Sequence, residues 1–409
     1  MGCREGTRSI AMLSPYRQEG DPVMSATDSA LNRYTRDLCR ALHERGIRVS
    51  VLTARSRRND RRWDDGGLPI VPSYRRGTLS GPWAIARALR RRTEPILHVQ
   101  FELNAYGGAF SGYLLLPVLA AYRRKMRIVT TIHGLPPALD IDAGLIRGSG
   151  IRAPASAVRL GVQALGVGLA RVSDHIVVPN AAQRALVVNE YRAPPERVSV
   201  IHNGTDAVSE GPSREDSRRR LGLSPDAVVL LFFGFWSPFK RLDLLVPAVK
   251  TWLEGGENRV FILAGSVSPR YSGQKTFGEP ADVRRLRTPG FVPDEEVASY
   301  FRAADALVLP YGVAVGTAAL GTSLAYDLPV LASKPLAADL AFSTYFDLSH
   351  DSMVEALQRF AEEPEFRERI KRESLALKAT RTWAQHAAST ERIYEALAPE
   401  PSRSAMARA

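Results

Sequence analysis

The sequence predicts an α/β protein built from two doubly wound, Rossmann-like domains, and three observations point to this fold class. The chain has 409 residues, too many for one ordinary core and suited to about two domains of ~150–200 residues. Hydrophobic residues make up 45% and charged residues 24%, the balance of a folded chain. Short apolar runs alternate with helical patterns, as in parallel βαβ units. Two such sheets joined by one linker would face each other across a ligand-binding cleft.

The first half of the chain supplies the first sheet. Apolar, β-branched runs predict its strands at 9–13, 48–53, 96–100, 127–133, 175–179 and 198–201. A helix is expected over 28–45, because Leu31, Tyr34, Leu38 and Leu42 share one face and Gly46 stops it.

The second half repeats the alternation. Strands are expected at 228–234, 260–264, 307–310, 329–332 and 345–348, and helices at 241–253, 294–303 and 316–326. We therefore expect an N-terminal domain over 1–205 and a C-terminal domain over 206–382. A last helix, 383–399, would pack back toward the first domain, and 400–409 would form a disordered tail.

Composition excludes several classes of protein. There are two cysteines, Cys3 and Cys39, without a CxxC motif or a Cys/His cluster, so neither a disulfide scaffold nor a metal site is expected. No apolar run reaches the ~18–20 residues that span a bilayer, and the N-terminus lacks a signal-peptide core. A cytoplasmic protein without a cofactor is the expectation.

Positive charge is concentrated in the first half. Residues 1–200 carry 30 Lys and Arg against 16 Asp and Glu, whereas the remaining residues carry 25 against 27. Such asymmetry indicates an anionic partner or, equally, a solvated surface in an arginine-rich chain. No aromatic residues interleave with the cations, so nucleic acid is not an expected partner.

One apolar segment, 113–122, runs directly into the cations at 123–127. It is too short to span a bilayer but could lie on an anionic membrane, which would make the protein peripheral at the inner face. Alternatively, the segment is a helix buried against the first sheet and the cations cap its end.

His133 is the first candidate for chemistry, because it stands where a buried strand runs into a Gly-Leu-Pro-Pro loop. A histidine there can hydrogen-bond a sugar hydroxyl or a phosphate, and Gly134 would let a ligand approach the backbone. The alternative is a histidine that only caps the strand end.

Lys240 is the second candidate. A strand breaks at Gly234, a Ser-Pro turn follows, and a helix begins near Arg241. Cations and N–H groups at such a junction form an anion site. The chain has seven Lys against forty-eight Arg, so a lysine at this place suggests a compact charge suited to phosphate. The alternative is a solvated cation at a helix start.

The third candidate is the small-residue turn at 316–319. Backbone N–H groups near Gly316, Thr317 and Ala318 could hold a diphosphate, although small residues also serve helix–sheet packing.

Together these segments resemble the retaining glycosyltransferases of family 4, which have the GT-B fold. The resemblance covers most of the chain, and each motif gains weight from its order and spacing. The similar segments are 34–46, 130–134, 174–180, 200–206, 234–240, 290–296, 304–310 and 383–394.

Several positions depart from the family pattern. Residues 25–30, including Ser29, replace an early Gly-Gly loop, and Phe235 stands where a phosphate-binding Arg is usual. Counted back from Pro329, the two carboxylates of the family's E-x7-E motif fall on Ala314 and Thr322. Some relatives use a Ser-Gly pair instead, which would align with Thr317 and Ala318.

The resemblance implies sugar transfer from a nucleotide-diphospho-sugar with retention of configuration and without a metal. His133 and Lys240 would be catalytic, and Ser29 and Gly134 would lie on the acceptor side. The donor site would consist of Gly234, Phe235, Lys240, Phe291, Val292, Gly316, Thr317 and Ala318. Two other interpretations stay open: a catalytically impaired relative that binds nucleotide or a partner subunit, and a sugar-nucleotide epimerase of the same fold.

Overall fold

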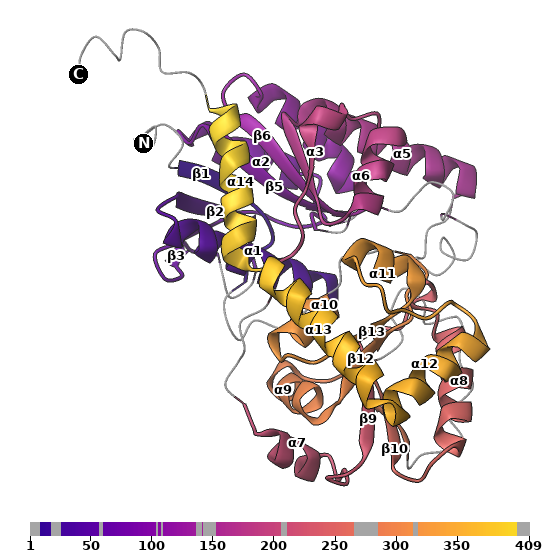
Figure 1. Ribbon diagram of the computed structural model, residues 1–409. Helices are drawn as coiled ribbons and strands as arrows, with labels where there is room; N and C mark the ends of the chain where they lie inside the picture. Colours follow the sequence, from indigo (N-terminus) through magenta and orange to yellow (C-terminus); the bar gives the residue numbers. More distant parts are fainter. Residues whose placement is uncertain are drawn as a thin grey trace. The chain divides into compact units, whose positions relative to one another are not determined.

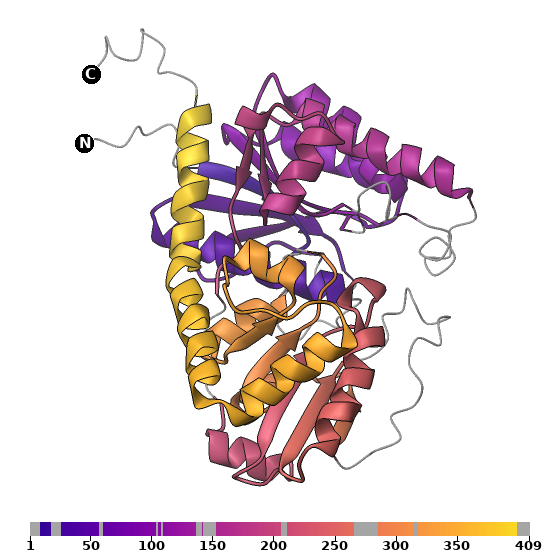
Figure 2. The same cartoon turned by 45° about the vertical axis from the view of Figure 1, so that its right-hand side comes forward.

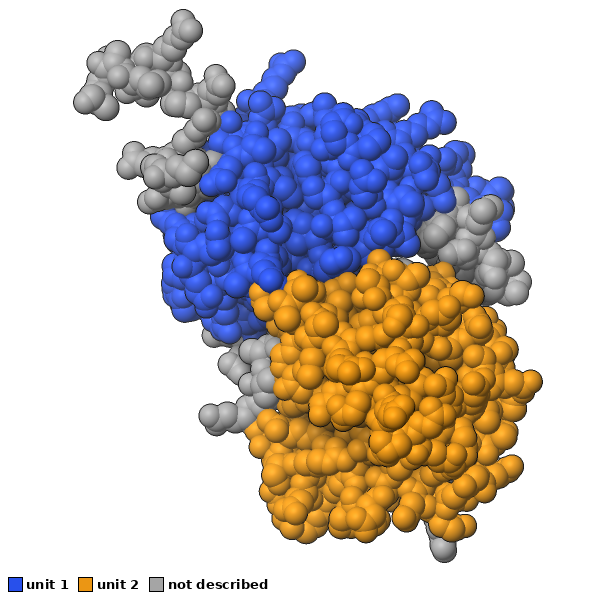
Figure 3. Space-filling view, viewed as in Figure 1, with its two compact units in different colours: residues 1–142, 153–204, 383–409 blue, residues 143–152, 205–382 orange. Residues whose placement is uncertain are grey.

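The computed structural model describes residues 9–17, 26–56, 60–103, 105–107, 109–135, 141, 153–205, 211–265, 285–313 and 318–398. The chain divides into two compact units, coloured separately in Figure 3. Unit 1 comprises residues 1–142, 153–204 and 383–409, and unit 2 comprises 143–152 and 205–382. The predicted α/β class is confirmed, because nearly all strand pairs in both units are parallel.

Unit 1 contains an eight-stranded sheet in the order β3-β4-β2-β1-β5-β6-β7-β8. All neighbours are parallel except β3 and β4. The strands are β1 Ser9–Leu13, β2 Arg48–Ala54, β3 Trp63–Asp64, β4 Pro69–Tyr74, β5 Ile96–Glu102, β6 Arg127–Gly134, β7 His175–Val178 and β8 Val198–Val200.

Helices cover both faces of this sheet. They are α1 Ala26–Glu44, α2 Gly81–Arg90, α3 Ala109–Tyr122, α5 Ala155–Val172, α6 Ala181–Asn189 and α14 Trp383–Leu397. Helices α1 and α14 pack together on one face, and α2, α3 and α5 form a packed row elsewhere on the unit (Figures 1 and 2). Residues from opposite ends of the chain therefore share one core, which includes Leu38, Val129 and Tyr394.

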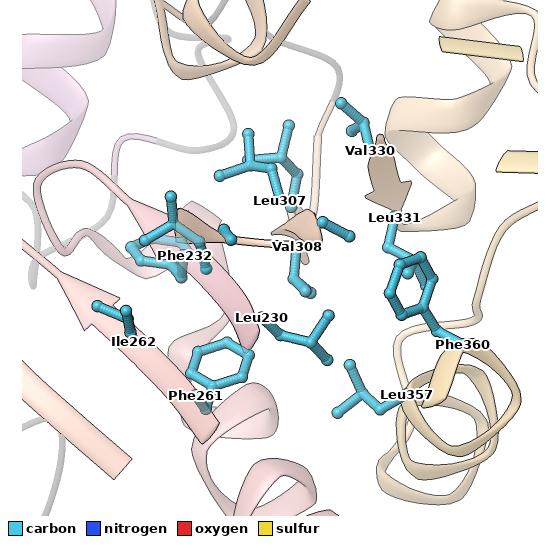
Figure 4. Packing of buried hydrophobic residues seen from close by; sticks show 14 of the residues in the cluster. Leu230, Phe232, Phe261, Ile262, Leu307, Val308, Val330, Leu331, Leu357 and Phe360 are labelled. Carbon is cyan, nitrogen blue, oxygen red and sulfur yellow. The ribbon is translucent and has the colours of Figure 1, made fainter. Parts of the chain in front are cut away.

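Unit 2 contains a five-stranded parallel sheet in the order β11-β10-β9-β12-β13. The strands are β9 Val228–Phe233, β10 Arg259–Ala264, β11 Leu286–Gly290, β12 Ala306–Leu309 and β13 Val330–Ala332. The helices are α7 Arg214–Arg220, α8 Leu242–Glu254, α9 Asp294–Ala303, α10 Ala318–Ala325, α11 Lys334–Leu340, α12 His350–Glu362 and α13 Pro364–Thr380. Figure 4 shows Leu357 and Phe360 of α12 packing toward the strands.

One predicted strand is wrong. Residues 345–348 form a single bridge between Ser333 and Phe346 rather than a strand. Neighbouring backbone N–H groups are taken by side chains, since those of Ser343 and Thr344 donate to Glu373 and that of Asp347 donates to Ser352 Oγ. A continuous ladder therefore cannot form.

Three strands beyond the predicted set belong to the sheets: the two-residue β3, β4 and β11. Strand β4 contains Pro69 and Pro72, and β11 contains Pro289. Proline removes a backbone donor and weakens the strand signal, but it is tolerated at bulges and on sheet edges. The β2–β4 pair has a register shift after Thr53, and β11 is an edge strand.

Helix α3 decides between the two interpretations of segment 113–122. Leu115, Val118 and Leu119 are buried, and α3 packs against α2 and α5. The segment is thus a helix packed inside unit 1, as the second interpretation predicts. The cations after it, however, bond carbonyls of neighbouring helices, since Arg123 donates to Arg171 O and Lys125 donates to Leu89 O and Arg90 O. Among the helices in the described parts of the chain, none combines the length and apolarity needed to cross a membrane.

Candidate functional site

In unit 1, His133 lies near the carboxyl end of β6, beside β5. Its Nε2 is 2.7 Å from Oε1 of Gln100. Its ring meets that of Tyr34 edge to face, with centroids 4.4 Å apart. Burial, and then the neighbouring His386, lower the pKa of His133 to about 3, so the ring is neutral near pH 7.

Gln100 fixes which nitrogen of His133 carries the proton. The amide Nε2 of Gln100 faces the Met12 sulfur at 3.2 Å, a contact that suits an N–H donor. The amide oxygen therefore faces His133 and can only accept, so Nε2 of His133 donates. The other nitrogen, Nδ1, is left as a hydrogen-bond acceptor.

A buried polar network continues from this pair to the last helix. His386 donates from Nδ1 to the carbonyl of His202 at 2.8 Å, so its Nε2 accepts from the Tyr34 hydroxyl at 2.9 Å. His98 bonds Tyr394 Oη at 2.6 Å and Thr131 Oγ1 at 2.7 Å. Burial lowers the pKa of His98 to about 3 and that of His386 to about 4.

Sequence reasoning did not single out Gln100, His98 or His386. One signal was available on the strand itself, because His98 and Gln100 are two residues apart in an otherwise apolar run and so share one face of β5. Ser29 lies within α1, and Gly134 ends β6. A Cβ added to Gly134 would meet nothing within 4 Å, which leaves open space at this strand end.

In unit 2, three neighbouring strands each lead into a glycine with positive φ. These are Gly234 after β9 (φ 123°), Gly265 after β10 (φ 134°) and Gly290 at the end of β11 (φ 77°). Gly234 N–H donates to Ala264 O at 3.0 Å, and Gly265 N–H donates to Gly290 O at 2.8 Å. A Cβ on Gly265 would lie 2.1 Å from Gly234 O. The carboxyl edge of the sheet is thus backbone without side chains at three neighbouring strand ends, and at Gly290 an added Cβ would meet nothing within 4 Å.

Lys240 ends a short 3-10 helix, Pro238–Lys240, beside this edge. Its Nζ lies 5.5 Å from the ring centroids of both Phe232 and Tyr311. A Cβ added to Gly234 would come within 2.8 Å of Nζ, so the ammonium lies close to the bare strand end.

The charge of Lys240 is not neutralised within the described part of the chain. Burial alone lowers its pKa to about 8, and Nζ forms no hydrogen bond or ion pair with a described residue. The next residue, Arg241, is bound to Asp243 through three contacts of 2.9–3.3 Å. Ser237 Oγ, three residues before Lys240, is buried and likewise finds no partner among the described residues.

The remaining predicted donor residues lie at neighbouring strand ends. The rings of Phe235 and Phe291 are 6.3 Å apart, and the Phe291 side chain is 58% exposed whereas Val292 is buried. Ala318 is exposed and begins α10. Gly316 and Thr317, like Ala314, fall outside the described residues. Within the described ranges, no three His, Cys, Asp or Glu side chains group as metal ligands would.

Comparison with known proteins identifies the family. Residues 31–208 match the family described as Glycosyltransferase Family 4, and residues 213–375 match Glycosyl transferases group 1. The chain is 33% identical to D-inositol 3-phosphate glycosyltransferase from Streptomyces scabiei, over 95% of this chain and 91% of that protein. It is 28% identical to the enzyme of the same name from Thermobifida fusca, over 88% and 87%.

Solved structures agree on the fold. Sucrose-phosphate synthase from Thermosynechococcus elongatus superposes with a TM-score of 0.67 at 18% identity, covering 95% of this chain and 99% of that chain. HepE from Anabaena, solved with UDP and glucose, superposes with a TM-score of 0.64 at 14% identity, covering 95% and 100%. The chain therefore belongs to glycosyltransferase family 4, and it is a glycosyltransferase with the GT-B fold.

Proposed function

We propose that this glycosyltransferase takes its sugar from a nucleotide-diphospho-sugar and transfers it with retention of configuration. The observation that carries the proposal is Lys240, a buried ammonium without a carboxylate partner in the described chain, beside three glycine-ended strands. A diphosphate would supply the missing counter-charge, and bare backbone would let it come close. The UDP-glucose complex of HepE, a neighbour in fold, supports this class of donor.

The barrier in such a transfer is departure of the leaving group. Negative charge develops on the diphosphate oxygen as the bond to the sugar breaks. Lys240 would stabilise that charge electrostatically, and the N-terminus of α10, which begins at Ala318, would add a favourable dipole. These groups supply the charge stabilisation without a metal.

On the acceptor side, His133 would orient the sugar. Its ring is neutral and its Nδ1 is an acceptor, so it can receive a hydrogen bond from a sugar hydroxyl. Gln100 acts as a positioning residue, because it holds the ring through Nε2 and need not touch the substrate.

Three measurements test the proposal. Titration calorimetry with UDP, GDP and ADP should show binding by the wild type, and Lys240→Ala should lose about 1.5–3 kcal/mol, as for a hydrogen bond to a charged group. His133→Ala should lower turnover more than nucleotide affinity. NMR of the product then shows whether the anomeric configuration of the donor is kept.

The acceptor requires a panel of compounds. D-inositol 3-phosphate belongs in it because the named relatives carry that substrate in their names, together with glycan and glycolipid acceptors. Unchanged nucleotide affinity in Lys240→Ala would refute the donor site. Tight nucleotide binding without transfer to any acceptor would instead favour the second interpretation, a catalytically impaired family member that binds nucleotide. The observation behind that interpretation is Phe235, which stands where the family usually has an Arg.

A further inference from the structure

Unit 1 exposes two large apolar side chains that are close together in sequence, at the start of α2. Trp83, in the first turn of α2, is 74% exposed, and Leu79, four residues earlier, is 69% exposed. The opposite side of α2 buries Pro82, Ile85 and Leu89. The core is therefore complete without Trp83, whose exposed indole is typical of an interaction surface.

Cations continue the same face of α2. Arg87 and Arg90 follow Trp83 at helical spacing and are exposed, and Arg91 is exposed directly after the helix. Arg124 joins them from the end of α3, because Lys125 Nζ donates to the carbonyls of Leu89 and Arg90 at 3.3 and 3.0 Å.

These cations keep their charge available. Arg87, Arg90, Arg91 and Arg124 form no ion pair with a described residue. By contrast, Arg92 is paired with Glu94, and Arg123 with Asp174. The sequence contains no Asp or Glu over 66–93 or over 103–139, the stretches that hold α2 and α3.

We propose that the α2 face, formed by Leu79, Trp83, Arg87, Arg90, Arg91 and Arg124, docks the protein on an anionic lipid surface. Trp83 and Leu79 would enter the boundary between headgroups and acyl chains while the arginines meet lipid phosphates. A single indole beside an aliphatic side chain suits a bilayer interface, whereas single-stranded nucleic acid requires successive aromatic platforms. The docking element is α2, because the apolar side of α3 is already buried.

Vesicle binding of the full chain tests this proposal. Phosphatidylcholine vesicles with and without phosphatidylglycerol are sedimented with the protein at low and high ionic strength. Wild type should bind the anionic vesicles and be released by salt. Arg87→Glu with Arg90→Glu should weaken binding roughly 25-fold or more, at about fivefold per lost cation. Trp83→Ser should weaken vesicle binding roughly tenfold. The part of the tryptophan emission that comes from Trp83, obtained as the difference between wild type and Trp83→Phe, should shift to the blue when vesicles are added.

Matched controls keep the result specific. Leu160→Ser removes another exposed leucine of unit 1 (68% exposed), and Arg369→Glu with Arg372→Glu makes the same charge change on exposed residues of unit 2. Both should bind vesicles like wild type, as should Lys240→Ala, which separates docking from the donor site.

Three outcomes would overturn the proposal. The first is wild type that stays in the supernatant at low salt. The second is an equal loss of binding in the control variants. The third is a single-stranded oligonucleotide that binds the same face more tightly than the anionic vesicles do, which would assign it to nucleic acid. Circular dichroism checks that the variants are folded. If the Arg87→Glu, Arg90→Glu variant does not fold, vesicle binding by Trp83→Ser tests the proposal in its place.

Discussion

The carboxyl edges of the two sheets are built in opposite ways. In unit 1, buried side chains fill the edge with a hydrogen-bonded network in which His133 is held by Gln100 and Tyr34 by His386. In unit 2, glycines leave the edge bare, and Lys240 stands over aromatic rings without a counter-charge in the described chain. Unit 1 thus presents the neutral ring of His133 in a fixed orientation, whereas unit 2 presents the ammonium of Lys240, whose charge an anionic ligand would neutralise.

Mild acid should destabilise unit 1 far more than unit 2. Six of the seven histidines lie in the residues of unit 1, and three of them have pKa values lowered to about 3–4 by burial. Below about pH 6.5 these histidines bind protons in the unfolded chain but stay neutral in the folded unit, so the free energy of unfolding decreases as the pH is lowered. Between about pH 7.5 and about pH 5.5 the three together should remove about 4 kcal/mol.

Hydrogen exchange read by mass spectrometry distinguishes the two units in this experiment. Peptides from unit 1 should lose protection and those from unit 2 should not. His350→Gln, at the exposed histidine of unit 2, is the control and should change nothing. Equal loss of protection in both units would contradict the role given to the histidine network.

The bare edge of unit 2 should not tolerate a side chain. Gly265→Ala places a Cβ against Gly234 O in a backbone region that L-residues avoid, so we expect a loss of about 3 kcal/mol from strain and overpacking. Gly222→Ala is the matched control, because φ is also positive there but nothing lies within 4 Å, and it should cost about 1 kcal/mol. Urea unfolding measures both. Similar losses would show that contact with Gly234 does not matter.

The charge on Lys240 should make diphosphate binding depend on pH. Its lowered pKa means that the cation is present below about pH 8 and lost above it. Affinity for UDP should therefore fall about tenfold, or about 1.4 kcal/mol, between about pH 7 and about pH 9. Lys240→Arg stays charged and should abolish this dependence. A flat titration for wild type would mean that Lys240 does not meet the diphosphate.

The smallest effect is expected at Gln100. Gln100→Leu removes the acceptor for His133 Nε2–H, and turnover should fall roughly fivefold, the effect of one neutral hydrogen bond. Nitrogen-15 NMR should show His133 protonated at Nε2 in wild type and in mixed tautomers in Gln100→Leu. Gln100→Glu keeps an acceptor and should restore the single tautomer. An unchanged tautomer in Gln100→Leu would remove Gln100 as a positioning residue, whatever the fate of the donor site.

Much of the fold could be predicted from the sequence because buried parallel strands are continuous apolar runs. The strand at Ser9–Leu13 and the helix at Asp294–Ala303 have the predicted bounds. Prolines hid β4 and β11, whose places depend on a bulge and a sheet edge. The strand expected at 345–348 does not form because side chains take the backbone N–H groups around it. Glu373, distant in sequence, accepts from Ser343, and Ser352, five residues further on, accepts from Asp347.

The candidate site was predictable only where local geometry creates it. Lys240 is marked by a strand, a turn and a helix start within a few residues, and Gly234 by the strand end. The surroundings of His133 include Gln100 from another strand and His386 from the last helix. His386 is itself held by the carbonyl of His202, which lies more than 180 residues earlier in the chain. No local pattern carries such a contact. The exposure of Trp83 was equally hidden, because periodicity alone does not say which face of α2 the rest of the unit covers.

Helix α14 also sets the order in which the molecule can be completed. Tyr34, His98 and the carbonyl of His202 find partners in His386 and Tyr394, which leave the ribosome after all of unit 2. Most of unit 1 is synthesised first, but its core is complete only after α14 has been made. Before α14 packs, these polar groups and the apolar stripe on α1 face water. A fragment ending at Gly204 is therefore not a domain, and an isolated unit 1 would have to be made by splicing residues 383–398 onto it.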